Sequence, residues 1–131
     1  MPRLCPAAVA AALLIQPAGA CLRYEPDPVS LTGTVRRVMA YGPPNYGENP
    51  ATDAKEPYLA LVLPTPICVE AAGDSPAETE LRQLQIVFTR LRPDRSLVGH
   101  RVRITGTLFH QTTAHHQTPV LIEPSRIDRQ E

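Results

Sequence analysis

Two segments that lie far apart in the chain carry nearly the same strand pattern. Val29-Ser-Leu-Thr-Gly-Thr-Val35 and Val102-Arg-Ile-Thr-Gly-Thr-Leu108 align without a gap, and both alternate apolar and polar residues. This period of two is typical of a half-buried β-strand. Each segment has a glycine near its centre, Gly33 or Gly106, and a glycine inside a strand marks a bulge, a bend or a close backbone approach. Two strands that bend at matched places predict a small, strongly curved β-barrel.

Three further strands are predicted from β-forming residues between turn signals: Tyr58–Leu63, Leu84–Thr89 and Thr118–Glu123. The first of these can continue past Pro64 and Pro66 as an edge or a bulge, because proline donates no ladder hydrogen bond. The last is expected to pair as a hairpin with the strand that ends at Phe109. Five strands in this order predict an all-β fold, a small five-stranded OB-like Greek-key barrel. An irregular β-sandwich is the alternative.

Two connections are expected to hold at most short helices. Ser75-Pro76-Ala77-Glu78 combines an N-cap serine, a proline at the first helical position and a capping-box glutamate. It therefore predicts a helical turn or two before the third strand. The segment from Arg90 to His100 contains Pro93, Asp94 and Gly99, which predict a turn or a brief helix.

Residues 1–20 have the layout of a secretory signal peptide. Arg3 is their only charge, an apolar run follows from Ala7 to Ile15, and Ala18-Gly19-Ala20 gives a small-x-small cleavage site. The apolar run is shorter than the roughly 20 residues that span a bilayer, so no transmembrane segment is expected. The sequence predicts cleavage after Ala20 and one exported domain over residues 21–131.

Cleavage would remove Cys5 and leave two cysteines, Cys21 and Cys68. An even pair in an exported chain predicts one disulfide. The alternative is a lipoprotein acylated at Cys21, although Ala18 stands where a lipobox has a large aliphatic residue.

The charge balance argues against nucleic acid as a partner. The chain has 13 basic and 13 acidic residues and no tryptophan, whereas nucleic-acid binders show a basic face and aromatic stacking platforms. Seven arginines could still form a local patch that binds an anionic ligand. The alternative is that they simply occupy the alternate, solvent-facing positions of strands. The arginines in question are Arg36, Arg37, Arg90, Arg92, Arg95, Arg101 and Arg103.

The connection from Ala40 to Pro57 is long for a compact domain, in which structureless loops beyond about 12–15 residues are usually functional or disordered. It includes Tyr41-Gly-Pro-Pro-Asn-Tyr-Gly47, which predicts a stiff loop with exposed rings. Tyr41, Asn45 and Tyr46 are therefore candidate ligand-binding residues. The alternative is that this loop packs over one end of the barrel.

Three of the four histidines, His110, His115 and His116, fall within seven residues. If alternation continues from Val102, His110 points inward, and a buried neutral imidazole is the alternative to a functional one. His115 and His116 lie in the predicted hairpin loop. Zinc accepts three imidazoles with one open position, and imidazoles also bind copper. The metal hypothesis therefore assigns zinc or copper to these three histidines, with water or Glu48, Asp53 or Glu56 as a fourth ligand.

No catalytic motif accompanies the histidines. The disulfide accounts for both exported cysteines, and no serine lies in a G-x-S-x-G turn. We expect no enzyme activity, and no cofactor apart from the zinc or copper of the metal hypothesis.

Ordered segments along the exported domain resemble those of an uncharacterised exported bacterial family, the domain of unknown function DUF4431. They are Cys21–Pro26, Leu31–Thr34, Gly42–Tyr46, Pro66–Val69, Gly106–His110 and His115–Val120. The resemblance implies a bacterial envelope protein, favours the disulfide over the lipoprotein, and implies that the glycine-proline loop and the histidine hairpin form one functional surface. Ala114 and Gln117 depart from a family hairpin richer in histidine and glycine, and the family's longer helix is shortened here to Leu91–Ser96.

We therefore expect a secreted or periplasmic binding module without catalysis. Its envelope or extracellular ligand, a small molecule, a glycan or a protein, would be held by the Tyr41–Tyr46 loop and the His110–His116 hairpin. The alternatives are a metal-binding envelope protein and a structural accessory domain in which the histidines pack the hairpin.

Overall fold

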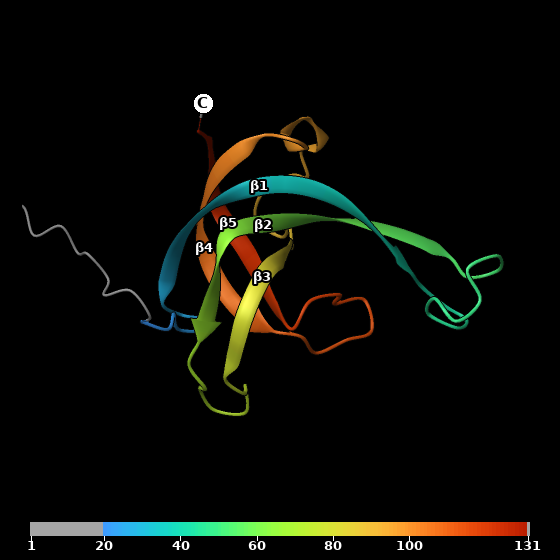
Figure 1. Ribbon diagram of the computed structural model, residues 1–131, viewed down its shortest axis with the longest axis horizontal. Coiled ribbons are helices and arrows are strands. Elements are labelled where there is room, and N and C mark those ends of the chain that lie inside the picture. The colour runs from blue at the N-terminus through green and yellow to red at the C-terminus, as the bar shows by residue number, and fades with distance from the viewer. Residues whose placement is uncertain (1–19, 131) are drawn as a thin grey trace, which may run out of the picture.

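Five strands form the fold in the computed structural model, which describes residues 20–130 (Figure 1). The strands are β1 (Pro28–Tyr41), β2 (Lys55–Val69), β3 (Glu78–Ile86), β4 (Arg101–His110) and β5 (Val120–Arg129), with a 3-10 helix η1 (Arg95–Leu97) between β3 and β4. They pair in the order β1-β2-β3-β5-β4, and β4 pairs with β1, so the sheet closes in a ring. Of the pairs among these five described strands, only β3–β5 is parallel, which makes the sheet mixed. The predicted all-β class and strand count are confirmed.

The two strands with the matched pattern are neighbours in the sheet. Gly33 of β1 pairs with Val102 of β4, and Gly106 of β4 pairs with Val29 of β1. A Cβ atom at Gly106 would overlap the carbonyl oxygen of Glu123, and one at Gly33 would overlap that of Val62. Glycine is required at both positions because another strand crosses too closely for a side chain, as predicted.

Alternating residues of the strands fill the interior of the ring. On β4, Val102, Ile104 and Leu108 are fully buried, and burying each such side chain stabilises the fold by about 1.5–3 kcal/mol. The β4–β5 pairing passes from Thr105–Arg126 to Gly106–Pro124. The extra residue of this bulge, Ser125, therefore lies on β5, and the alternation along β4 continues undisturbed to His110.

The first two strands are longer than the sequence predicts. Arg37–Tyr41 of β1 pairs with Lys55–Leu59 of β2 as a two-stranded ribbon, which we call the arm. The arm extends away from the ring, and residues 42–54, the arm loop, lie at its tip (Figure 1). The alternative in which this loop packs over an end of the ring is therefore wrong.

The helix predicted from Ser75 to Glu78 is absent from the described residues, where β3 begins at Glu78. The β2–β3 pairing shifts register between Val62–Gln83 and Ile67–Leu81, and both Leu81 and Leu84 lie in the core. The two leucines therefore have a helical spacing although they lie on a strand. The 3-10 helix Arg95–Leu97 confirms the brief helix predicted in the following connection.

A disulfide joins Cys21 to Cys68, as predicted, across a sequence separation of 47. It attaches the segment before β1 to the end of β2, where the Leu22 N–H also donates to the Cys68 carbonyl at 2.8 Å. Residues 1–19 of the predicted signal peptide lie outside the described residues. Among the described residues, no helix has the length and apolar character needed to cross a membrane.

Candidate functional site

His110, at the end of β4, points into the protein as the strand alternation predicts. Its Nε2 lies 3.2 Å from Oε1 of Glu78, its Nδ1 lies 3.2 Å from the Gln111 carbonyl oxygen, and its side chain is only 17% exposed. Tyr24 meets the imidazole edge-on, with ring centroids 6.3 Å apart. These contacts join β4, β3 and the disulfide-linked segment, so His110 has the surroundings of a packing residue.

Tyr24 itself is buried and donates its hydroxyl to the Pro76 carbonyl at 2.7 Å. Burial, and after it the nearby charge of Glu78, raise the pKa of the Tyr24 phenol. The phenol is therefore a neutral hydrogen-bond donor that fixes the chain before β3.

His116 stabilises the hairpin loop, residues 111–119 between β4 and β5. Its Nδ1 accepts the backbone N–H of Thr112 at 2.9 Å. Its ring meets Phe109 edge-on, with centroids 5.5 Å apart. The imidazole thus closes the loop on itself.

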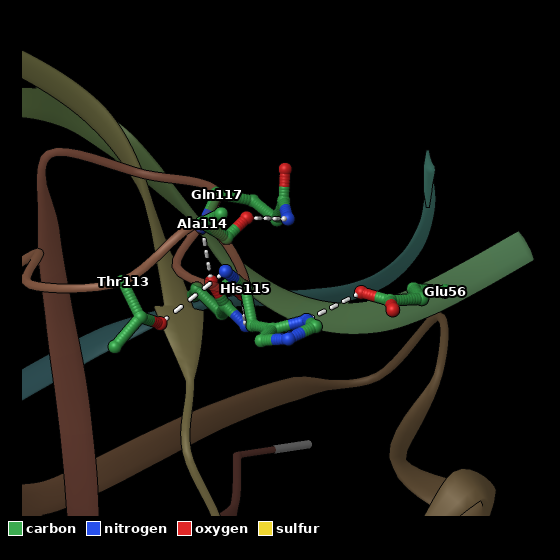
Figure 2. A network of polar contacts seen from close by, with 6 residues as sticks. Glu56, Thr113, Ala114, His115 and Gln117 are labelled. Atoms are coloured by element: carbon green, nitrogen blue, oxygen red, sulfur yellow. Dashed lines mark hydrogen bonds and ion pairs between the residues drawn. The ribbon is translucent and has the colours of Figure 1, made fainter. Parts of the chain in front are cut away.

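His115 lies in the same loop and makes the contact that joins the two predicted regions (Figure 2). Its Nδ1 lies 2.8 Å from Oε2 of Glu56, and the side chains are 62% and 31% exposed, respectively. Because the partner is a carboxylate, Nδ1 is the donor of this hydrogen bond. The other ring nitrogen, Nε2, has no hydrogen-bond partner among residues 20–130. His115 therefore links the hairpin loop to β2 with one nitrogen and keeps the other available.

Gln85 of β3 holds the hairpin loop in place. Its Oε1 accepts the backbone N–H of Gln117 at 2.6 Å, and its Nε2 donates to the His115 carbonyl at 3.4 Å. The backbone N–H of Gln85 donates to Oγ1 of the buried Thr118 at 2.9 Å, and that hydroxyl donates to the Val120 carbonyl at 2.7 Å. The loop is thereby fixed against the strand that carries Gln85.

Strand alternation places Glu56 and Tyr58 on one face of β2, because they are two residues apart. Ala60 continues that face, and Gln85 is its partner across β3. Leu61 and Leu84, on the opposite face, belong to the core. We call the surface formed by Glu56, Tyr58, Gln85 and the hairpin loop the outer face.

Asp53 organises the arm loop. Its carboxylate is buried and accepts the backbone N–H groups of Asn45, Gly47 and Asn49 at 2.9, 2.8 and 3.1 Å. Burial opposes the charge, but these hydrogen bonds outweigh it and hold the pKa of Asp53 below its usual value. A buried carboxylate with three N–H donors makes the loop a fixed structure rather than a free connection.

The arm loop presents Tyr46 in an uncommon conformation. This residue has a φ of 51°, in the left-handed region, and is 50% exposed. Such backbone geometry is rare for a bulky residue and costs on the order of 1–3 kcal/mol. Tyr41 is instead half-buried at the base of the loop, next to Gly47.

The arm loop and the hairpin loop meet through Glu56. A Cβ atom at Gly42 would overlap the Glu56 carboxyl group, so a glycine at the start of the arm loop leaves room for the side chain that reaches His115. Within residues 20–130, no hydrogen bond or ring contact joins Tyr41, Asn45 or Tyr46 directly to a histidine. The two predicted regions are therefore neighbours, connected by a carboxylate.

The three histidines do not form one ligand set. Each has partners of its own, and no three His, Cys, Asp or Glu residues of the described part of the chain are grouped to hold a metal ion. The geometry therefore does not support the metal hypothesis for His110, His115 and His116, because β4 turns His110 inward while the hairpin loop carries His115 to the arm. Glu48 and Asp53 do not complete such a site either.

Sequence reasoning missed Gln85 and Tyr58, and it assigned Glu56 only as a metal ligand. Nothing in the local pattern marks them, since a polar residue on the outer face of a strand is ordinary. Only the pairing of β2 with β3 and the path of the hairpin loop bring them together.

The family comparison covers the second half of this site. Residues 83–128, from the middle of β3 into β5, match the model of DUF4431, a domain of unknown function. The match includes Gln85 and all three clustered histidines, whereas Glu56 and the arm loop lie before it. No curated protein matches the chain.

Proposed function

We propose that this protein is an exported, non-catalytic binding module of the bacterial envelope or extracellular space, built on an OB-like Greek-key barrel. The strand order β1-β2-β3-β5-β4 with a parallel β3–β5 pair supports the OB type. The predicted signal peptide and the disulfide-linked segment support the compartment. OB barrels bind ligands on the β2–β3 face and with the β1–β2 and β4–β5 loops, which here are the outer face, the arm loop and the hairpin loop.

The observation that carries the proposal is the 2.8 Å contact between His115 and Glu56. It joins the hairpin loop to the first turn-side residues of β2, next to Gly42 of the arm loop. Each loop is fixed from inside, by Asp53 in the arm loop and by Gln85 under the hairpin loop. Prearranged loops lose little conformational entropy on binding, so this arrangement favours recognition.

The exposed groups favour a glycan as the first ligand class to test. Tyr46 offers a rigid ring held in a costly backbone conformation, and a tyrosine gives a large amphipathic contact area at low entropy cost. Asn45 and His115 Nε2 supply polar groups that match sugar hydroxyls. A small molecule or a protein would use the same residues with a different balance of apolar and polar contacts.

The test is a calorimetric titration of the oxidised, exported full chain with soluble peptidoglycan fragments and chitooligosaccharides. We expect saturable binding that weakens at least tenfold in a Tyr46→Ala, His115→Ala double variant. Met39→Ala is the matched control, because Met39 is a large exposed side chain (42%) on the same arm, and it should bind like the parent. Equal binding by the parent and the double variant would contradict the proposed surface.

The structural alternative rests on His110 and His116, whose partners lie within the fold. If no ligand of the panel binds and the double variant unfolds like the parent, the accessory-domain hypothesis replaces the binding module.

A further inference from the structure

A concave site lies on the other face of the arm. Arg37 of β1 pairs with Leu59 of β2, and strand alternation places Leu59 on the same face as Leu61, which is in the core. This is the face opposite to Glu56. A cavity of ≈ 260 Å³ opens there, and its walls include Arg37, Tyr58, Leu59, Ile86, Phe88 and Arg95.

The walls of this cavity are mainly apolar. Ile86 is buried, while Leu59 and Phe88 pack against the core and remain partly exposed. Phe88 lies at the edge of the hydrophobic core and is partly exposed. Its ring can therefore contact a ligand without any rearrangement of the sheet. Ligand sites are typically concave, apolar and lined by a few placed polar groups.

The charged groups of the cavity are both cationic. Arg37 projects from the arm and Arg95 from η1, and neither makes an ion pair with any residue that the structure describes. Asp94, the neighbour of Arg95, turns its Oδ1 to the N–H and hydroxyl of Ser96 as the cap of η1. No carboxylate of residues 20–130 lines the cavity, so both charged residues in its wall are arginines without an ion-pair partner among the described residues.

We propose that this cavity binds a small organic anion, with its acid group held by Arg37 and Arg95 and its apolar or aromatic body against Leu59 and Phe88. Guanidinium groups recognise carboxylates and phosphates through paired N–H donors. The volume lies below the roughly 300–1,000 Å³ of typical ligand pockets, so the body of the ligand is about the size of one ring. Tyr58 borders both this cavity and the outer face, but Arg37 and Leu59 lie on the face of the arm opposite to Glu56, so the two sites use different charged groups.

The test compares benzoate with benzamide, which has nearly the same shape and no charge. The oxidised full chain is titrated with each compound, and backbone amide shifts are followed by NMR. We expect saturable shifts at residues 37, 59, 88 and 95 with benzoate, and binding at least tenfold weaker with benzamide. Phenyl phosphate in a third titration distinguishes a carboxylate from a phosphate as the preferred acid group.

Substitutions of the arginines test which of them bind the carboxylate of benzoate. Arg37→Gln with Arg95→Gln should weaken benzoate binding at least tenfold. Arg36→Gln is the matched control, since Arg36 is the preceding residue of β1, is also exposed, and points to the opposite face. Thermal unfolding checks that each variant is folded.

Three results would overturn the proposal: no saturable shift with either anion, equal affinity for benzoate and benzamide, or the same loss in the Arg36 variant as in the double variant. The Tyr46, His115 double variant should bind benzoate like the parent. Failure of one site therefore leaves the other unaffected.

Discussion

Two histidine–carboxylate pairs occupy different regions of this sheet. His110 and Glu78 lie beside the disulfide-linked segment, with 17% and 28% of their side chains exposed, and Tyr24 closes over the imidazole. His115 and Glu56 lie between the hairpin loop and the arm, and His115 is 62% exposed. The same pair of residue types thus serves as internal packing in one region and as a surface link between the hairpin loop and β2 in the other.

The difference comes from what surrounds each pair. The disulfide region has a covalent bond, a buried phenol and a core strand. The arm loop and the hairpin loop are instead held by hydrogen bonds to the side chains of Asp53 and Gln85. Covalent and apolar contacts set the stability of a fold, while exposed polar contacts contribute less and leave groups free for partners. A histidine cluster in sequence therefore need not be one site in space.

Removing the disulfide should have the largest effect on the free energy of unfolding. Replacing Cys21 and Cys68 with serine removes a cross-link with a sequence separation of 47, and the loop-entropy relation gives a loss of about 4 kcal/mol in the free energy of unfolding. Urea unfolding of the variant, with the parent in reductant as the matched comparison, measures this loss. A loss below about 1 kcal/mol would show that the region is held by its apolar contacts instead.

Replacing His110 and His115 one at a time should show that the two histidine–carboxylate pairs contribute differently to stability. His110→Ala leaves Glu78 without its partner and exposes the edge of Tyr24, so we expect a loss of about 1–2 kcal/mol in the free energy of unfolding. His115→Ala should cost less than about 0.5 kcal/mol, because exposed pairs contribute little. Chemical unfolding of both variants tests this order, and equal losses would remove the distinction between packing and surface link.

The smallest expected effect is local and depends on pH. The folded-state pKa of Asp53 lies below its unfolded value, so its contribution to the arm loop is complete above about pH 4 and is lost as the pH falls through the folded pKa. Amide exchange at Asn45, Gly47 and Asn49 should therefore quicken on acidification while the ring stays protected. Asp53→Asn should show the faster exchange already at neutral pH, and an unchanged rate would contradict the role of the carboxylate.

The fold could be predicted from the sequence where a residue type or a local pattern by itself fixes the backbone conformation or the direction of the side chain. Gly33 and Gly106 marked close strand crossings, and the alternation from Val102 placed His110 inward. The start of β3 was not predictable, since residues 78–83 are mostly polar on an exposed face and Glu80 breaks the alternation. The residues from Ser75 to Glu78 have the pattern of a helix N-terminus. The chain nevertheless continues as strand β3 from Glu78, because it pairs with β2 there.

The candidate site was predictable only in part, for the same reason. The sequence identified both loops, and the structure brings them together at Glu56 and His115. It did not identify the partner of any histidine, because each partner lies on another strand or in a backbone group. Such pairings depend on sheet register, which a single sequence does not reveal.

The parallel contact between β3 and β5 has a consequence for how the molecule assembles and opens. Only two residue pairs, Gln85–Leu121 and Ile86–Ile122, form this seam, whereas β4 and β5 share nine. The strands it joins are distant in sequence, so its formation carries a larger chain-closure cost than a hairpin does. We expect the seam to open first under mechanical load, which would leave an open sheet in the strand order β3-β2-β1-β4-β5.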